Sequence, residues 1–275
     1  MSYSAVITHV QADPEAGPRL ACAVEVARRF DAALIGVAAE MIQPLAYDTG
    51  YYSVEAEWIA AMREAIENRI AKARTLFGDA TAELADKAAF LSGLQLPAQA
   101  IALASRAADL IVAGGAPSSM RDRYTVCDTA ELAIISGRPV LVAPPIAAPL
   151  SAKRVLLAWK DTREARRALS DAMPFLERAE RVVVVAVGPG NVAEAAHRQI
   201  ADVAVALRRR KINVEAKVVE QAHDVGGQLL KQASLEGADL IVSGAYGHSR
   251  LGEWAFGGVT ADLLSQDQVY LLLSH

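Results

Sequence analysis

Five residues near the end of the chain have the types and spacing of an anion-binding site. Gly244 ends an apolar run, and Gly247 follows it in a turn where we expect positive φ and a close approach of ligand to backbone. Gly257 and Gly258 precede a predicted helix that starts at Thr260, and the free N–H groups of a helix N-terminus attract phosphate. The pattern predicts a site that holds a polyphosphate with main-chain donors. The alternative is that these glycines only serve tight turns.

Other kinds of site have little support in the sequence. There is no Walker motif, no G-x-S-x-G elbow and no carboxylate pair near the glycines, and Gly188–Gly190 lacks the third glycine of a dinucleotide fingerprint. The five histidines are scattered, and Cys22 and Cys127 fit neither a metal pair nor a disulfide framework. We therefore expect no catalytic residues and no metal site. His248, inside the glycine loop, either contacts the ligand or lies on the loop surface.

The glycine site lies in the second copy of a duplicated sequence. Residues Ala108–Gly114 read ADLIVAG, and residues Ala238–Gly244 read ADLIVSG. Where the second copy continues with its glycines, the first has Pro117, Cys127 and Asp128 at the corresponding positions. A duplicated fold with the glycines in one copy predicts two similar domains with one ligand site.

The first copy has residues that would close such a site. Asp128 followed by Glu131 is typical of a capped helix start, so the Asp128 carboxylate would occupy the N–H groups that a phosphate needs and would repel a phosphate. Pro117 lacks an N–H and forbids positive φ. We therefore expect a degenerate nucleotide site in the first half.

Strands alternate with helices along both halves, which predicts βαβ units and a mostly parallel sheet. The predicted strands of the first half are Ala5–Val10, Ala33–Ala38, Ala88–Leu91, Leu110–Ala113 and Val140–Ala143, and its helices are Arg19–Phe30, Val54–Leu76, Pro97–Ala107 and Thr129–Ile135. The predicted strands of the second half are Val155–Ala158, Val182–Val187, Val214–Val219, Leu240–Ser243 and Val269–Leu273, and its helices are Arg163–Leu176, Val192–Arg209, Val225–Ala233 and Thr260–Leu264. Three prolines in Pro144–Ser151 oppose helix and central strand, so we place the domains at 1–147 and 148–275. The irregular segment Met41–Ser53 is either a surface loop or a lid or interaction loop.

The two separated cysteines predict a reducing, cytoplasmic setting, and the composition limits the kinds of partner. Hydrophobic residues make up 53% of the 275 residues, enough for two sizeable cores, and the net charge of −4 argues against general attraction to nucleic acid or anionic membranes. The longest apolar run, Val182–Val187, is too short to span a bilayer, and the N-terminus lacks the pattern of a signal peptide. We expect no nucleic-acid or membrane partner.

The segment Gly244–Leu264 resembles the G-x2-G-x9-G signature of the universal stress protein family. Val155–Ala165 looks like the first strand and helix start of that family, and Val269–His275 like its last strand. The resemblance covers nearly the whole chain, because the family also occurs as tandem pairs of this size. It implies two flavodoxin-like or adenine-nucleotide α-hydrolase-like domains, each with a five-stranded mostly parallel sheet and flanking helices. It also implies ATP binding through the backbones of Gly244, Gly247, Gly257, Gly258 and Val259.

The chain departs from the family pattern at two positions. Many ATP-binding members have Ser where this chain has Gly258, so one hydroxyl contact is missing, and Thr260 offers a hydroxyl nearby. The Asp that commonly ends the first strand is replaced by Lys160, which cannot accept a hydrogen bond from an adenine amine. Lys160 either faces solvent or reaches the phosphates. Phosphate binding is therefore better supported than adenine recognition.

The predicted function is a stress-response sensor or regulator that binds ATP, with or without Mg²⁺, in its second half. The predicted nucleotide-binding residues are Gly244, Gly247, His248, Gly257, Gly258, Val259, Thr260 and Lys160. A homodimer or another protein partner fits the same interpretation. The alternatives are a chaperone-like or protein-interaction module with a vestigial nucleotide site, and a slow ATPase.

Overall fold

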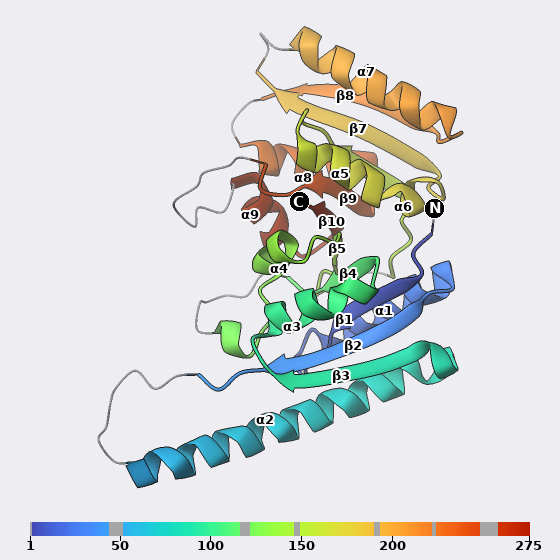
Figure 1. Ribbon diagram of the computed structural model, residues 1–275. Coiled ribbons are helices and arrows are strands. Elements are labelled where there is room, and N and C mark those ends of the chain that lie inside the picture. The colour runs from blue at the N-terminus through green and yellow to red at the C-terminus, as the bar shows by residue number, and fades with distance from the viewer. Residues whose placement is uncertain are drawn as a thin grey trace.

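All strands of the part of the chain that the structure describes belong to one sheet (Figure 1). The computed structural model describes residues 2–43, 52–115, 122–145, 149–189, 193–221, 224–247 and 258–275. Its strands are β1 (Ala5–His9), β2 (Ala33–Glu40), β3 (Ala88–Leu94), β4 (Leu110–Ala113), β5 (Val140–Val142), β6 (Arg154–Ala158), β7 (Arg181–Gly188), β8 (Val214–Glu220), β9 (Leu240–Gly244) and β10 (Tyr270–Ser274). They form a ten-stranded sheet in the order β3-β2-β1-β4-β5-β10-β9-β6-β7-β8.

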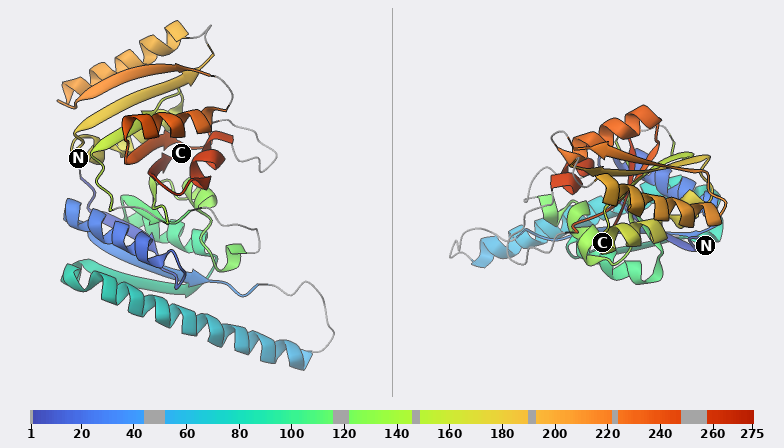
Figure 2. Two further views of the ribbon diagram at one scale, coloured as in Figure 1. Left: turned by 180° about the vertical axis from the view of Figure 1, so that it is seen from behind. Right: turned by 90° about the horizontal axis from the view of Figure 1, so that it is seen from above.

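The two halves of the sheet have the same internal order. The first half runs β3-β2-β1-β4-β5 and the second runs β8-β7-β6-β9-β10, and all pairs within each half are parallel. The halves meet where β5 pairs antiparallel with β10, with Leu141 opposite Leu272. The chain therefore forms two five-stranded units joined into one continuous sheet, which Figure 2 shows from behind and from above.

Helices cover both faces of the sheet because its strands are apolar on both sides. One face packs against α1 (Ala16–Phe30), α2 (Tyr52–Thr81), α5 (Arg163–Asp171), α6 (Met173–Leu176) and α7 (Ala193–Arg209). The other face packs against α3 (Pro97–Ala104), α4 (Thr129–Ile135), α8 (Val225–Glu236) and α9 (Gly258–Ser265). The short helices η1 (Ala82–Lys87), η2 (Ser105–Ala107) and η3 (Asp122–Tyr124) lie between these elements. In β9, Leu240 and Val242 join one core and Ile241 joins the other, as the two-residue period of a strand requires.

The aspartate of the duplicated sequence has the same structural role in both halves. Asp109, just before β4, accepts hydrogen bonds from the backbone N–H groups of Ser4 (2.7 Å) and Ala5 (3.2 Å). Asp239, just before β9, accepts from the backbone N–H of Lys153 at 3.1 Å. Each aspartate therefore ties the start of one central strand to its neighbour, which explains the residue without a ligand.

Aromatic side chains join the halves at the amino ends of the strands. The Tyr3 hydroxyl donates to the backbone oxygen of Asp171 at 2.6 Å. The rings of Tyr3, Phe30 and Phe175 pack together with centroids 4.9–5.6 Å apart, and the Arg178 guanidinium lies 4.3 Å above the Phe30 ring. The β5–β10 pairing is thus reinforced by side-chain contacts between the halves.

Some predicted boundaries differ from the structure. Helix α2 is longer than the predicted Val54–Leu76, and strand β3 continues to Leu94. The proposed domain boundary at 147 falls in residues 146–148, and most of the Met41–Ser53 segment falls in residues 44–51, so both lie outside the described residues. Among the described helices, none is both long and apolar enough to cross a membrane.

Candidate nucleotide site

The described residues of the predicted site lie at the carboxyl edge of the second-half sheet. Gly244 ends β9, Gly247 follows it, and Gly258 begins α9. Lys160 comes two residues after β6, which pairs with β9. The carboxyl ends of parallel strands are where ligands bind in open α/β sheets. His248 and Gly257 lie outside the described residues.

Among the residues that the structure describes, none caps the first main-chain N–H groups of α9. The first N–H groups of a helix have no partner within it, and the first turn of α9 has no acidic side chain. A Cβ added at Gly258 would meet no atom of the described residues within 4 Å, so these residues leave space beside the helix start. Val259 is half-buried and Thr260 is buried. A ligand at the start of α9 would therefore meet the backbone N–H groups more readily than the Thr260 hydroxyl.

Gly244 is required by close packing of the backbone. A Cβ there would lie 2.7 Å from the backbone nitrogen of Ala165 and 2.7 Å from the carbonyl carbon of Glu164. Both atoms belong to the first turn of α5, which packs against β9. Close packing against α5 therefore explains the glycine at position 244 without a ligand.

The prediction of positive φ at Gly247 was wrong. In this turn the left-handed backbone falls on Tyr246, with φ 56°. Gly247 instead leaves room for side chains of the α5 start: a Cβ there would lie 3.0 Å from Glu164 Oε2 and 3.5 Å from Thr162 Oγ1. Position 247 therefore needs a glycine because the backbone lies close to Glu164, and not because it has a positive φ.

Glu164 is a functional candidate that the sequence analysis missed. Its side chain is only 10% exposed, and its Oε1 accepts a hydrogen bond from Arg163 Nε at 3.2 Å. Burial acts to raise the pKa of this carboxyl, but hydrogen bonds from its own backbone N–H and from Thr162, with the charge of Arg163, bring the pKa below its usual value. The carboxylate beside the glycine turn is therefore ionised. The available signal was an acidic residue two places after the Thr162 cap of a helix that directly follows a strand.

Lys160 lies in the tight turn between β6 and α5. The backbone N–H of Thr162 donates to the Lys160 carbonyl at 2.6 Å, and the Lys160 side chain is exposed. The preceding residue, Trp159, is buried, and among the described residues its Nε1 has no hydrogen-bond partner. The positively charged Lys160 therefore lies at the same edge of the sheet as the start of α5.

The first-half counterpart of the α9 start is capped, as predicted. Asp128 Oδ1 accepts from the backbone N–H groups of Ala130 (2.9 Å) and Glu131 (3.0 Å) at the start of α4. The turn after β4 is filled as well, because Arg19 Nη1 lies 3.1 Å from the position of a Cβ on Gly114. Pro117 lies outside the described residues.

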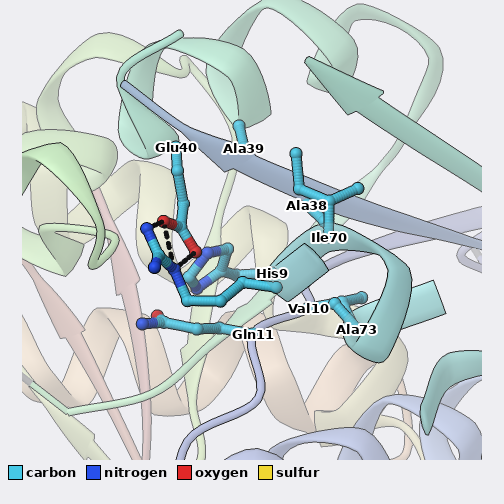
Figure 3. Close-up of a pocket in the computed structure, with 9 residues that line it drawn as sticks. His9, Val10, Gln11, Ala38, Ala39, Glu40, Ile70 and Ala73 are labelled. Atoms are coloured by element: carbon cyan, nitrogen blue, oxygen red, sulfur yellow. Dashed lines mark hydrogen bonds and ion pairs between the residues drawn. The ribbon is translucent and has the colours of Figure 1, made fainter. Parts of the chain in front are cut away.

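Side chains also fill the ends of β1 and β2 in the first half. A cavity of about 10 Å³ remains there, the space of roughly one water molecule. Figure 3 shows His9, Gln11 and Glu40 around it, and Arg69 Nη2 pairs with Glu40 Oε2 at 2.7 Å. Burial lowers the pKa of His9 to about 3, so this imidazole is neutral at pH 7. The described part of the first-half edge therefore has a capped helix start and packed side chains at the ends of β1 and β2.

The described residues hold no group of three or more His, Cys, Asp or Glu side chains arranged to bind a metal ion. The second-half edge combines the main chain of α9, the ionised Glu164 and the exposed Lys160. Such an arrangement can bind an anion at α9 and accept hydrogen bonds at Glu164.

Solved structures with the same architecture include proteins described as universal stress proteins. A universal stress protein from Archaeoglobus fulgidus DSM 4304 has a TM-score of 0.72 with 16% identity, over 98% of this chain and 95% of that one. A protein from Pseudomonas aeruginosa UCBPP-PA14, described as a putative universal stress protein, has a TM-score of 0.62 with 15% identity, over 99% and 93% of the two chains. A protein of unknown function from Pseudomonas aeruginosa PAO1 has a TM-score of 0.61 with 15% identity, over 99% and 92%.

No protein-family model matches the chain, and no curated protein matches it. The structural likeness nevertheless spans nearly the full length of both chains in each comparison. Together with the repeated five-strand order, it shows that the chain has the fold of the universal stress proteins in two tandem copies.

Proposed function

We propose that the protein binds ATP in its second half and acts as a nucleotide-dependent regulator in a stress response. The observation that carries the proposal is the difference between two matching helix starts. In α4 the Asp128 carboxylate occupies the first N–H groups, whereas α9 starts at Gly258 with no acidic residue in its first turn. The names of the structurally similar proteins support the stress-response part of the proposal.

Simple electrostatics favours phosphate at α9. The N-terminus of a helix carries a partial positive charge, which contributes about 0.3–1 kcal/mol per anionic group at exposed sites. Hydrogen bonds from the first N–H groups of α9 would add to this attraction, and the described residues leave space beside Gly258 for a phosphate to approach them. Lys160 would contribute positive charge at the same edge, and Mg²⁺ would accompany the nucleotide where the phosphates remain exposed.

Two substitutions at Gly258 test the proposal. Gly258→Asp introduces the residue that caps α4, and Gly258→Ser introduces a neutral hydroxyl. The Cβ of either side chain would meet no atom of the described residues within 4 Å. We expect the wild type to bind ATP in calorimetry, Gly258→Asp to bind at least tenfold more weakly, and Gly258→Ser to bind at least as tightly as wild type. The absence of ATP binding to the wild type, or an equal affinity of the two variants, would contradict the proposal.

One observation favours a protein-interaction role as the second candidate. The first part of α2 extends beyond the sheet, and it carries Ile59, 46% exposed, and Met62, 36% exposed (Figures 1 and 2). We expect a variant with both residues changed to Ser to self-associate less than the wild type in sedimentation-velocity experiments. Identical, concentration-independent sedimentation of both proteins would contradict a self-associating surface on α2.

A further inference from the structure

We propose that Glu164 makes the second-half site selective for a ligand with sugar hydroxyls, and that it confines phosphate groups to the start of α9. The hydroxyls would lie at the turn Gly244–Gly247 and donate hydrogen bonds to the Glu164 carboxylate. This inference rests on the proposed nucleotide binding and specifies how the ligand is oriented.

The position of the carboxylate is fixed by the fold. Glu164 lies in the first turn of α5, whose backbone is in close contact with Gly244 at the end of β9. Its Oε2 lies 3.0 Å from the position that a Cβ on Gly247 would occupy. Because Gly247 has no side chain and is exposed, a ligand on this turn would lie close to that oxygen.

The donors among the described residues leave the carboxylate acceptor capacity for a ligand. An ionised carboxylate has about four lone-pair positions and no donor. Oε1 accepts from the Arg163 guanidinium at 3.2 Å, and further hydrogen bonds come from Thr162 and from the Glu164 backbone N–H. Oε2 faces the turn, where the matching group on a ligand must be a hydrogen-bond donor.

Charge then determines which part of a nucleotide lies there. A phosphate next to an ionised, largely buried carboxylate is repelled, because water screens the two charges poorly. The hydroxyls of a sugar are neutral donors, and carboxylates bind ribose hydroxyls in the same way in dinucleotide-binding sheets. The phosphates are therefore directed to the first N–H groups of α9, which has no acidic residue in its first turn.

The first half shows a different arrangement at its corresponding turn. There, a Cβ on Gly114 would meet both Arg19 Nη1 at 3.1 Å and Glu15 Oε2 at 3.2 Å, so a guanidinium also faces this turn. Arg19 is buried, whereas the Arg163 side chain beside Glu164 is 76% exposed. The negative charge of Glu164 is therefore less completely balanced within the protein.

Calorimetry with three ligands tests the inference. ATP, 2′,3′-dideoxy-ATP and inorganic tripolyphosphate are titrated into the wild type, Glu164→Gln and the control Arg163→Gln, which keeps the carboxylate. We expect the wild type to prefer ATP to dideoxy-ATP by about tenfold, the size of one hydrogen bond to a charged group. We expect Glu164→Gln to reduce this preference below about threefold and to bind tripolyphosphate about tenfold more tightly than wild type, whereas Arg163→Gln keeps the preference for ATP.

The outcomes separate the two proposals. Equal affinity of the wild type for ATP and dideoxy-ATP, or an unchanged preference in Glu164→Gln, would overturn the role of Glu164 while leaving ATP binding intact. No ATP binding to the wild type would overturn the proposed function itself. The wild-type comparison requires no substitution, so the inference is tested even if Glu164→Gln does not fold.

Discussion

Replacing Gly244 with Ala tests the contact that brings the glycine turn and Glu164 together. The added Cβ would lie 2.7 Å from the backbone nitrogen of Ala165, 2.7 Å from the carbonyl carbon of Glu164 and 2.9 Å from Glu164 Cβ. Two of these atoms are backbone, so no side-chain rotation relieves the overlap. The end of β9 and the start of α5 would have to move apart.

The cost of that movement follows from the size of the overlap. Overpacking a close contact costs about 1–3 kcal/mol of unfolding free energy, and more when backbone must shift. For a protein of this size the melting temperature would fall by about 2–12 °C. The loss should extend to ligand binding, because the shift displaces Glu164 from the turn.

Urea denaturation and thermal melting measure the effect, with Gly258→Ala as the matched control. A Cβ at Gly258 meets no atom of the described residues within 4 Å, so this variant should retain wild-type stability or gain slightly from reduced chain entropy. Stability of Gly244→Ala within about 0.5 kcal/mol of wild type would refute the close packing of β9 on α5.

Three further predictions follow from individual side chains. Asp128→Ala should lower the unfolding free energy measured in urea by about 1 kcal/mol. Asp128→Asn should lower it by much less, because Asn also caps helices. Equal losses in the two variants would contradict the capping role of Asp128. Because burial lowers the pKa of His9 to about 3 while an unfolded histidine titrates near 6.5, the wild type should lose stability as the pH falls from about 6.5 towards 3. His9→Gln should weaken that dependence, and identical pH profiles in denaturation experiments would contradict the burial of His9. Lys160→Asp should raise the preference for ATP over GTP in calorimetry, because Asp provides an acceptor for the adenine amine. An unchanged ratio of the two affinities would show that residue 160 does not contact the base.

The sequence was informative where structure is determined locally. Alternating apolar segments predicted each strand, and the repeated aspartates at 109 and 239 marked equivalent strands in the two halves. The Asp128 cap was also predictable, because a cap acts on N–H groups two and three residues away.

The remaining features depend on contacts between distant segments. Nothing in the alternation of strands and helices specifies that β5 and β10 pair antiparallel, because parallel units with two free edges can join in several ways. Likewise, Glu164 and Gly247 are far apart in the chain, and only the packing of α5 on β9 brings them together. The positive φ at Tyr246 was missed because glycine is the usual residue for that conformation.

The central claim is that nucleotide phosphates bind the start of α9 and not the start of α4. Titration of ATP into isotope-labelled protein, followed by amide NMR, tests it most directly. We predict that the amide signals of Val259 and Thr260 shift with ATP concentration, while those of Ala130 and Glu131, which donate to Asp128, stay in place. Shifts at Ala130 and Glu131 with none at Val259 and Thr260 would contradict it.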